Sequence, residues 1–328
     1  MKFFVTGATG YVGRALVRKL IREGHTVHAL YRTPSKAAIL NHPRIHSFQG
    51  DLLYPKSLEK AMSGCIAVFH SAAKTDMWSQ NPNLFYQINV LGTRNVMDCA
   101  SRLGADKVVV TSTAGVYGPS SFPMDESRGF SSSFFSVYEK TKAAADRTAV
   151  HYTQKGMKVV LVHPTRIYGP GPLSQSNSVT RMIKYYLEGK WRFMLNNGRA
   201  RGNYVYIDDV VDGHISAMQR GCSGESYIIG GENASYEKFF STLEAVSGKK
   251  RTLMGIPAKG ILLLSLLQLS LAENFKISPA ITPAMVRKLS TDWVISHKKA
   301  EKELGYFPLS LREGLRNTLD WIKSSQEE

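Results

Sequence analysis

The amino-acid sequence predicts an α/β fold, in which helices cover both faces of a doubly wound parallel sheet and a smaller lobe is interleaved in the second half. Three observations lead to this prediction. Strand-like and helix-like segments alternate through the first half, and most of the strand-like segments contain continuous apolar runs. Uninterrupted apolar strands are typical of a parallel sheet that is buried on both faces. The alternation then breaks at a turn-forming stretch, Tyr168-Gly169-Pro170-Gly171-Pro172.

The elements can be placed in order from the second residue. The first strand covers residues 2–5, and the glycine-rich stretch 6–13 leads into a helix at 14–21 whose apolar residues share one face. Further strands are expected at 27–31, 45–48, 66–69, 107–111 and 158–162, and further helices at 55–62, 89–103 and 134–154. In such a sheet, ligands bind beyond the carboxyl ends of the strands.

The second half of the sequence predicts a smaller lobe that is formed by two separate segments of the chain. Strand-like runs at 204–207 and 227–229 flank a helical segment that we expect to return to the main sheet. The predicted main domain therefore comprises residues 1–170, with 205–232 returning to it. Residues 171–204 and 233–328 form the smaller lobe, which we expect to shape a substrate pocket.

The glycine-rich stretch predicts an anion site. Gly7, Gly10 and Gly13 follow a strand and open a helix, with the spacing G-x-x-G-x-x-G. Glycines let the backbone turn sharply and approach a ligand closely, and the free N–H groups of the helix favour a phosphate. The first hypothesis is therefore that this loop binds the pyrophosphate of a dinucleotide. A purely structural turn is the alternative at this point.

A tyrosine and a lysine four residues apart predict an acid–base pair. Tyr138 and Lys142 share one face of the expected helix at 134–154. An ammonium beside a phenol lowers the pKa of the phenol, so such a tyrosine can exchange protons near neutral pH. The hydroxyl residues Thr111, Ser112 and Thr113 end the preceding strand, where one of them can hold a substrate oxygen.

Composition excludes several classes of protein. The chain has 328 residues and a formal net charge of +16, but its basic residues are scattered and no nucleic-acid-binding module accompanies them. A solvated basic surface that attracts anionic cofactors or membrane headgroups is the better interpretation. The three cysteines are widely spaced and indicate neither a disulfide framework nor a metal site. The glycine motif begins almost at the first residue, so we expect no secretory leader and a cytoplasmic location.

One apolar segment, residues 260–272, contains no charged residue. It is too short to cross a bilayer. A helix in the core or at a dimer contact is the favoured interpretation. An apolar lid over a greasy substrate and a helix at a membrane surface are the two others.

Taken together, the motifs resemble those of the extended short-chain dehydrogenase/reductases. This group includes NAD-dependent epimerase/dehydratases, dihydroflavonol reductases and 3β-hydroxysteroid dehydrogenases, and the resemblance spans essentially the whole chain. The motifs that carry it are Thr6-Gly7-Ala8-Thr9-Gly10-Tyr11-Val12-Gly13, Gly50-Asp51-Leu52, His70-Ser71-Ala72-Ala73, Asn89-Val90-Leu91-Gly92-Thr93, Tyr138 with Lys142, Pro164-Thr165-Arg166-Ile167-Tyr168-Gly169-Pro170-Gly171 and Tyr206-Ile207-Asp208-Asp209-Val210. The resemblance implies a Rossmann-type fold, and a homodimer through the long central helices.

The resemblance also implies roles for individual residues. Thr113 becomes the catalytic hydroxyl with Ser112 as runner-up, Tyr138 becomes the proton donor or acceptor, and Lys142 tunes it and binds the nicotinamide ribose. Asn89 is expected to be structural. The remaining cofactor contacts are Gly7, Thr9, Gly10, Tyr11, Val12 and Gly13 around the pyrophosphate, Asp51 and Leu52 beside the adenine, Ala72 and Ala73 near the ribose, and Pro164 to Ile167 along the nicotinamide.

The residues after the second strand favour NADP over NAD. NAD-binding members place a carboxylate there, whereas this chain has Arg32 and, further on, Lys36. Arg32 can stack on the adenine and pair with a 2′-phosphate, with help from Lys36. NAD is retained as the second choice.

The expected reaction is the reduction of a ketone or aldehyde of a fairly apolar small molecule, or the reverse oxidation. Dehydratases of the family follow the catalytic threonine with Asp-Glu, whereas this chain has Ala114-Gly115. Epimerases of nucleotide sugars carry a diphosphate-binding arginine where this chain has Gly202, although Arg201 or Arg199 lies nearby. His163 also departs from the usual arginine, with no assigned effect. A nucleotide-sugar epimerase is the alternative function, and a redox-sensing NADP-binding regulator is a second one.

Overall fold

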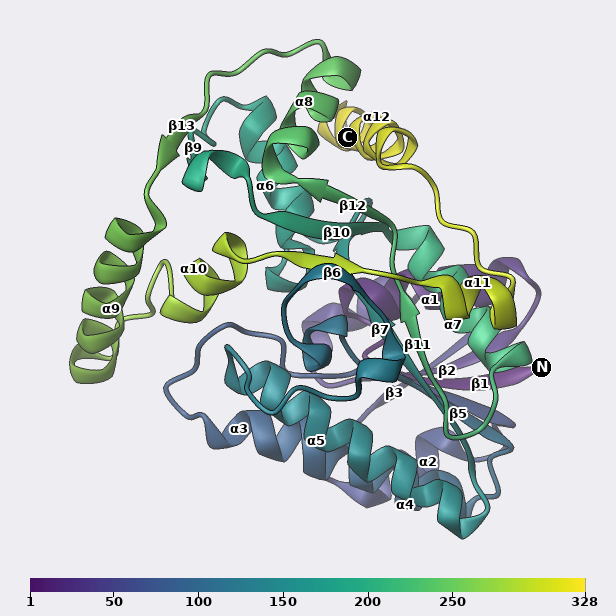
Figure 1. Cartoon of the computed structure of the whole chain (residues 1–328). Helices are drawn as coiled ribbons and strands as arrows, with labels where there is room; N and C mark the ends of the chain where they lie inside the picture. Colours follow the sequence, from purple (N-terminus) through teal and green to yellow (C-terminus); the bar gives the residue numbers. More distant parts are fainter. Residues whose placement is uncertain (328) are drawn as a thin grey trace.

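Seven parallel strands form the centre of the computed structural model, which describes residues 1–327 (Figure 1). Their order is β11-β7-β5-β4-β1-β2-β3, so the chain leaves the centre in opposite directions on the two sides of the β1/β4 pair. The carboxyl ends at such a reversal form a crevice for ligands. The strands are β1 (Lys2–Thr6), β2 (Thr26–Tyr31), β3 (Ile45–Gln49), β4 (Ala67–His70), β5 (Lys107–Thr111), β7 (Lys158–Pro164) and β11 (Ser226–Ile229).

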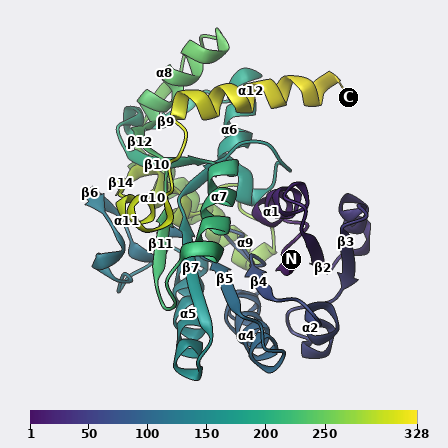
Figure 2. The ribbon, with the colours of Figure 1, turned by 90° about the vertical axis from the view of Figure 1, so that its right-hand side faces the viewer.

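Helices cover both faces of this sheet, which confirms the predicted fold class (Figure 2). Alternate strand residues point to opposite faces, so Val109 joins one core and Val108 and Val110 join the other. One core is closed by α1 (Tyr11–Arg22), α7 (Ile207–Arg220) and α11 (Lys298–Leu304). The other is closed by α2 (Pro55–Met62), α4 (Gly92–Arg102) and α5 (Val137–His151).

Two helices differ from the sequence expectation at their starts. The helix expected at 89–103 begins earlier, with α3 (Asn83–Tyr86), and continues through a π-helical turn, η2 (Gln87–Leu91), into α4. The helix expected from residue 134 begins at Val137, because the Ser136 hydroxyl accepts the N–H of Glu139 at 3.3 Å and caps it. That cap places Tyr138 in the first turn of α5.

Short 3₁₀ helices and a small strand pair connect these elements. The 3₁₀ segments are η1 (Pro34–Leu40), η3 (Ala114–Tyr117), η4 (Glu126–Arg128), η5 (Tyr152–Lys155), η6 (Gln175–Asn177) and η7 (Asn196–Gly198). Strand β6 (Ser120–Met124) pairs in parallel with β14 (Trp293–Ile295). This pair joins the first half of the chain to its last third.

The second lobe is built around a three-stranded sheet of order β12-β10-β8. The run expected at 204–207 belongs to this small sheet and ends at residue 206, after which α7 and β11 rejoin the main sheet. The lobe comprises β8 (Arg166–Tyr168), α6 (Ser178–Leu187), β9 (Phe193–Leu195), β10 (Arg201–Tyr206), β12 (Glu232–Ser235), α8 (Tyr236–Ser247), β13 (Met254–Ile256), α9 (Ala258–Phe275), α10 (Pro283–Ser290) and α12 (Leu311–Glu327). Its core packs α6, α8 and α12 together.

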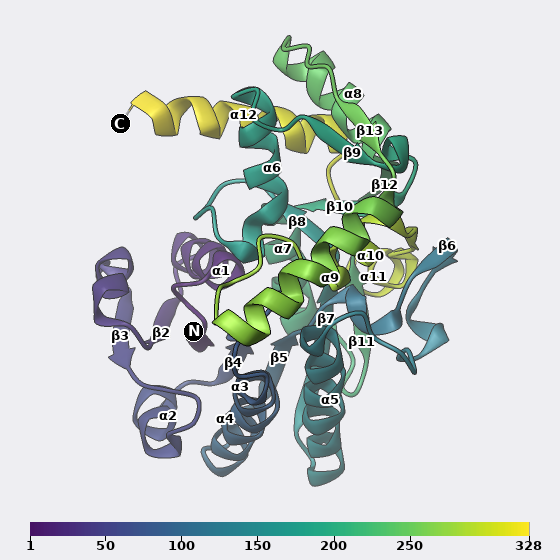
Figure 3. The same ribbon diagram turned by 90° about the vertical axis from the view of Figure 1, so that its left-hand side faces the viewer.

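Helix α9 contradicts the interpretation of the apolar segment as a core helix. Only Ser265 and Ala272 of this helix are buried, whereas Leu263 and Leu267 are 63% and 58% exposed. The helix packs against α10 and lies away from the main sheet (Figure 1), at the side of the molecule that faces the viewer in Figure 3. Its leucines therefore form an apolar outer surface. Within residues 1–327, no helix has the combination of length and apolarity that crossing a membrane requires.

Candidate functional site

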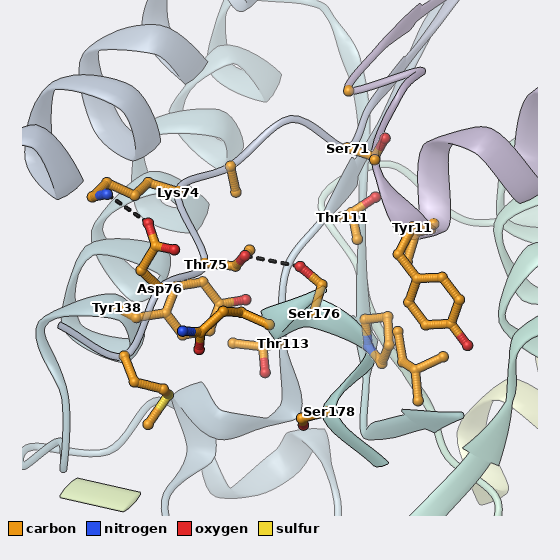
Figure 4. Close-up of a pocket in the computed structure, with 18 of the residues that line it drawn as sticks. Tyr11, Ser71, Lys74, Thr75, Asp76, Thr111, Thr113, Tyr138, Ser176 and Ser178 are labelled. Atoms are coloured by element: carbon orange, nitrogen blue, oxygen red, sulfur yellow. Dashed lines mark hydrogen bonds and ion pairs between the residues drawn. The ribbon is translucent and has the colours of Figure 1, made fainter. Parts of the chain in front are cut away.

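A cavity of about 960 Å³ lies at the carboxyl ends of the main strands, between the sheet and the second lobe. Figure 4 shows part of its wall, with side chains from β5, α5, the loop after β4 and the second lobe. Every site residue that the sequence predicted lines this one cavity: Gly7, Thr9, Gly10, Tyr11, Val12, Gly13, Arg32, Lys36, Asp51, Leu52, Ala72, Ala73, Thr113, Tyr138, Lys142, Pro164 and Ile167.

The glycine loop is packed so tightly that side chains are excluded at two of its three glycines. Gly7 has a φ of +68°, and a Cβ there would lie 2.7 Å from the backbone nitrogen of Ala72. A Cβ on Gly13 would lie 2.1 Å from the carbonyl oxygen of Gly7. Helix α1 starts at Tyr11 without a side-chain cap and without an acidic residue in its first turn. Its first N–H groups are therefore available to an anion.

The side chain of Tyr11 does not face the anion site. Its hydroxyl donates to the carbonyl oxygen of Gly169 at 3.1 Å, and its ring packs in the core of the second lobe. Tyr11 therefore ties the glycine loop to the second lobe. Any contact that it makes with a cofactor phosphate comes through its backbone.

Arg32 and Lys36 lie at the far end of the same cavity, after β2. Both are exposed, and neither has an ion-pair partner within residues 1–327. Asp51 is held by its own turn, because its Oδ1 accepts the N–H of Leu53 at 2.9 Å. The two cationic side chains are thus free to reach a negatively charged ligand.

A histidine that the sequence reasoning did not select fixes the glycine loop to β4. His70 is fully buried between two threonines, with Nδ1 2.8 Å from Thr6 Oγ1 and Nε2 2.9 Å from Thr93 Oγ1. Thr93 donates its hydroxyl hydrogen to the Asn89 carbonyl, so Nε2 of His70 must be the donor to Thr93. The ring proton of the neutral imidazole therefore lies on Nε2, which leaves Nδ1 to accept from the Thr6 hydroxyl. Burial lowers the pKa of His70 to about 3, and the Lys142 charge acts in the same direction.

This histidine makes the stability of the fold dependent on pH. The unfolded chain binds a proton on His70 below about pH 6.5, whereas the folded chain does not until about pH 3. Within that window stability falls as the pH falls. We expect the stability advantage of wild type over His70→Asn to shrink by about 1.4 kcal/mol per pH unit between pH 6 and pH 4. Urea unfolding at several pH values measures this, and a constant difference would contradict a neutral buried His70.

Tyr138 and Lys142 lie one turn apart on α5 and line the cavity together with Thr113. Figure 4 shows Tyr138 and Thr113 in the cavity wall. Lys142 is 2% exposed, and its Nζ donates to the carbonyl oxygen of Thr111 at 2.8 Å. Thr113 lies two residues after the end of β5 and caps η3, where its Oγ1 accepts the N–H of Gly115 at 3.2 Å. The hydroxyl hydrogen of Thr113 remains available for donation to an oxygen in the cavity.

The pKa of Tyr138 is raised above its ordinary value, which contradicts the expectation that Lys142 lowers it. Burial of the phenol is the main cause, and the charges of Glu139 and Asp146 add to it. The nearby hydroxyl of Thr113 acts in the opposite direction and lowers the pKa of the phenol. Burial also lowers the pKa of Lys142. The phenol is therefore protonated at neutral pH.

Ser112, the runner-up to Thr113, is part of a buried network. Its Oγ donates to Asp146 Oδ2 at 2.5 Å, and His163 Nε2 lies 3.1 Å from the same oxygen. The other ring nitrogen of His163 lies 3.3 Å from the hydroxyl of Tyr117. This network connects β5, α5 and β7 behind the cavity. His163, whose effect the sequence left unassigned, therefore helps to hold the strand end that carries Thr113.

The loop after β4 closes over the cavity through polar contacts that the sequence did not reveal. Thr75 Oγ1 lies 2.9 Å from Ser176 Oγ of the second lobe, and Lys74 pairs with Asp76 at 2.5 Å (Figure 4). Asn89 holds the base of this loop, because its amide hydrogen bonds both to the Lys74 backbone and to Thr141 Oγ1. No spacing rule indicates these partners, since they come from different segments.

The fold and this site define a class of enzyme. Residues 3–230 match the NAD dependent epimerase/dehydratase family, and the chain belongs to that family, whose members bind NAD or NADP.

Two curated relatives and one solved structure illustrate the similarity. The chain is 29% identical over 329 residues to a 2-alkyl-3-oxoalkanoate reductase of Stenotrophomonas maltophilia, covering 96% of this chain and 98% of the relative. It is 27% identical over 333 residues to the decarboxylating sterol-4-alpha-carboxylate 3-dehydrogenase of Mus musculus, covering 97% and 90%. The UDP-glucose 4-epimerase of Thermotoga maritima has a TM-score of 0.82 at 23% identity, covering 99% and 100%, which shows a shared fold.

The residues present fit a dinucleotide cofactor. The glycine cradle would be filled by a Cβ at Gly7 or Gly13, and the uncapped start of α1 supplies N–H donors for a pyrophosphate. The cavity continues from this loop past Ala72 and Ala73 to Tyr138 and beyond. One continuous space thus joins the anion site to the acid–base residues.

Proposed function

We propose that this enzyme is an NADP-dependent reductase of a ketone or aldehyde on a fairly apolar small molecule, acting also in the oxidising direction. The observation that carries the proposal is the convergence of Thr113, Tyr138 and Lys142 on the cavity that begins at the glycine loop. The apolar lining contributed by Ile281 and Met285 supports an apolar substrate. The two curated relatives named above, a reductase and a dehydrogenase by name, support the reaction class.

A nicotinamide cofactor held by the glycine loop and Lys142 would supply the hydride that reduces the carbonyl carbon. Thr113 donates a hydrogen bond to the carbonyl oxygen and holds it beside Tyr138. Tyr138 then transfers its phenolic proton to the oxygen as negative charge develops there. The raised pKa of Tyr138 suits this direction, because the phenol starts protonated and an alkoxide is a far stronger base than a phenolate. Lys142 carries the positive charge that stabilises the resulting phenolate.

The test of this proposal is the oxidation of NADPH, followed spectrophotometrically, with aldehydes, ketosteroids, flavonoid-like ketones, oxo acids and nucleotide sugars. Turnover of one apolar carbonyl class with stoichiometric use of NADPH is expected. Turnover of a nucleotide sugar without added cofactor, together with NAD that remains bound through purification, would instead establish an epimerase. Arg201, one of the two arginines near the position of the epimerases' diphosphate-binding arginine, is turned to Asp292, with Nη2 to Oδ2 at 2.8 Å, and does not line the cavity.

The preference for NADP rests on Arg32, with Lys36 beside it. We expect Arg32→Ala to weaken NADPH binding by roughly 10- to 100-fold, because a charge-assisted hydrogen bond to the 2′-phosphate is lost. Binding of NADH, which lacks that phosphate, should change little. Dissociation constants from cofactor fluorescence measure both, and Arg44→Ala, outside the cavity, is the matched control. Equal weakening of both cofactors, or a wild-type preference for NADH, would contradict the assignment.

A further inference from the structure

Arg166 places a guanidinium group in the wall of the cavity, on the side of the second lobe. It begins β8, which only Thr165 separates from the end of β7 in the main sheet. Its Nη1 donates to the hydroxyl of Tyr236 at 2.7 Å and lies 3.4 Å from the hydroxyl of Tyr204. Its Nη2 donates to the carbonyl oxygen of Lys288 at 3.2 Å. Every one of these partners is an uncharged group.

No carboxylate within residues 1–327 forms an ion pair with Arg166, although the residue is partly buried. Lys288 is already neutralised, because its Nζ pairs with Glu139 at 2.7 Å. The guanidinium has five N–H donors, and three hydrogen bonds to neutral acceptors leave donors available. A cation withdrawn from water without a counter-charge is costly unless something else compensates it.

The surroundings hold this guanidinium in one position. The rings of Tyr204 and Tyr236 lie 5.7 and 5.4 Å from its central carbon and provide cation–π contacts. Gly202, on the neighbouring strand β10, makes the space for it, since a Cβ there would lie 2.5 Å from Nη1. Gly202 is also the position at which the sequence lacks the arginine of the nucleotide-sugar epimerases. The positive charge is present in this region, but it comes from β8.

The position of Arg166 relative to the acid–base residues follows from Lys288. The Lys288 carbonyl accepts from Arg166, and the Lys288 ammonium pairs with Glu139, the residue next to Tyr138. Arg166 and Tyr138 thus line one cavity, and Lys288 contacts both Arg166 and the residue next to Tyr138. Apolar side chains, including Ile281, Met285 and Leu289, line the wall alongside them.

From this arrangement, and resting on the proposed function, we infer that the substrate is an oxo acid whose carboxylate binds Arg166 while its ketone faces Tyr138. A planar guanidinium edge with free donors matches a carboxylate. The carboxylate supplies the missing counter-charge, and the apolar wall accommodates the alkyl part. Arg166 is therefore a specificity-determining binding residue.

The first experiment compares 3-oxodecanoate with its methyl ester as substrates for the NADPH-loaded enzyme, with 4-oxo and 5-oxo acids of the same length to find the best spacing. We expect the best acid to exceed its ester in kcat/KM by at least tenfold. Arg166→Gln should lower kcat/KM for the acid by roughly 10- to 100-fold and leave the ester nearly unchanged. Arg166→Lys should retain part of the preference, and Arg199→Gln, an exposed arginine outside the cavity, is the charge-matched control.

Gly202→Ala gives a second variant in which the arginine is kept but displaced. The added methyl group meets only the flexible end of Arg166 among its nearest atoms, so we expect the variant to fold and to lose acid preference. Equal use of acid and ester, or equal losses for both in Arg166→Gln, would overturn the inference and leave the reductase proposal standing. If no carbonyl compound is reduced, the proposed function fails.

Calorimetry with 3-hydroxydecanoate and its methyl ester, in the presence of NADP, tests the same contact without turnover. The inference is supported if the acid binds the wild-type enzyme at least tenfold more tightly than it binds Arg166→Gln. Arg166-dependent binding of UDP with no binding of the acid would overturn it in favour of a diphosphate ligand.

Discussion

Replacing Tyr138 with phenylalanine is expected to lower kcat for carbonyl reduction by roughly 10²- to 10⁴-fold, because the variant lacks the proton that the developing alkoxide needs. The dissociation constant of NADPH should stay nearly unchanged, since the ring that borders the cavity remains. Steady-state kinetics and cofactor fluorescence measure the two quantities. Tyr86→Phe, an exposed tyrosine outside the cavity, controls for the change in side chain.

The pH dependence adds a second test of the role of Tyr138. Because burial raises the pKa of this phenol above 10, it stays protonated through the neutral range, and the reduction rate should show no loss through its ionisation between about pH 6 and pH 9. Full activity in Tyr138→Phe, with the wild-type pH profile, would show that another group donates the proton.

Replacing Gly7 with alanine is expected to cost on the order of 3 kcal/mol of folding stability and to abolish NADPH binding. Two effects add: a φ of +68° disfavours any side chain, and the new methyl group would lie within 2.9 Å of the Ala72 backbone, which cannot give way as a side chain can.

Gly24→Ala separates the two effects. Gly24 has a φ of +84°, but nothing lies within 4 Å of its added Cβ. This variant should lose only the conformational cost, about 1 kcal/mol, and bind NADPH normally. Chemical denaturation of both variants measures the difference. Equal losses of stability would mean that the close approach of the loop to β4 is not what requires glycine at position 7.

Features that depend on neighbouring residues could be predicted from the sequence. The strand, the glycine loop and the start of α1 form one local unit, and the four-residue spacing of Tyr138 and Lys142 places both on one helical face in any α-helix. The alternation of apolar strands with helices gave the class of sheet, and parallel topology brings all strand ends to one edge. For that reason residues as distant as Gly7, Asp51 and Thr113 were predicted to meet, and they line one cavity.

Only the tertiary structure decided how charges and hydrogen bonds are paired. The pKa of Tyr138 depends on its burial, which no spacing reveals, and the neutral His70 depends on threonines that are 64 and 23 residues away. From the sequence, the leucines of α9 were interpreted as part of a core or dimer-contact helix, but they are exposed. Apolarity alone does not determine whether other elements pack against a helix. Likewise, the sequence shows an arginine at 166 and a glycine at 202 as unrelated positions. Strands β8 and β10 are paired, so Gly202 leaves the space that the Arg166 guanidinium occupies. This pairing places a positive charge where the substrate is proposed to bind.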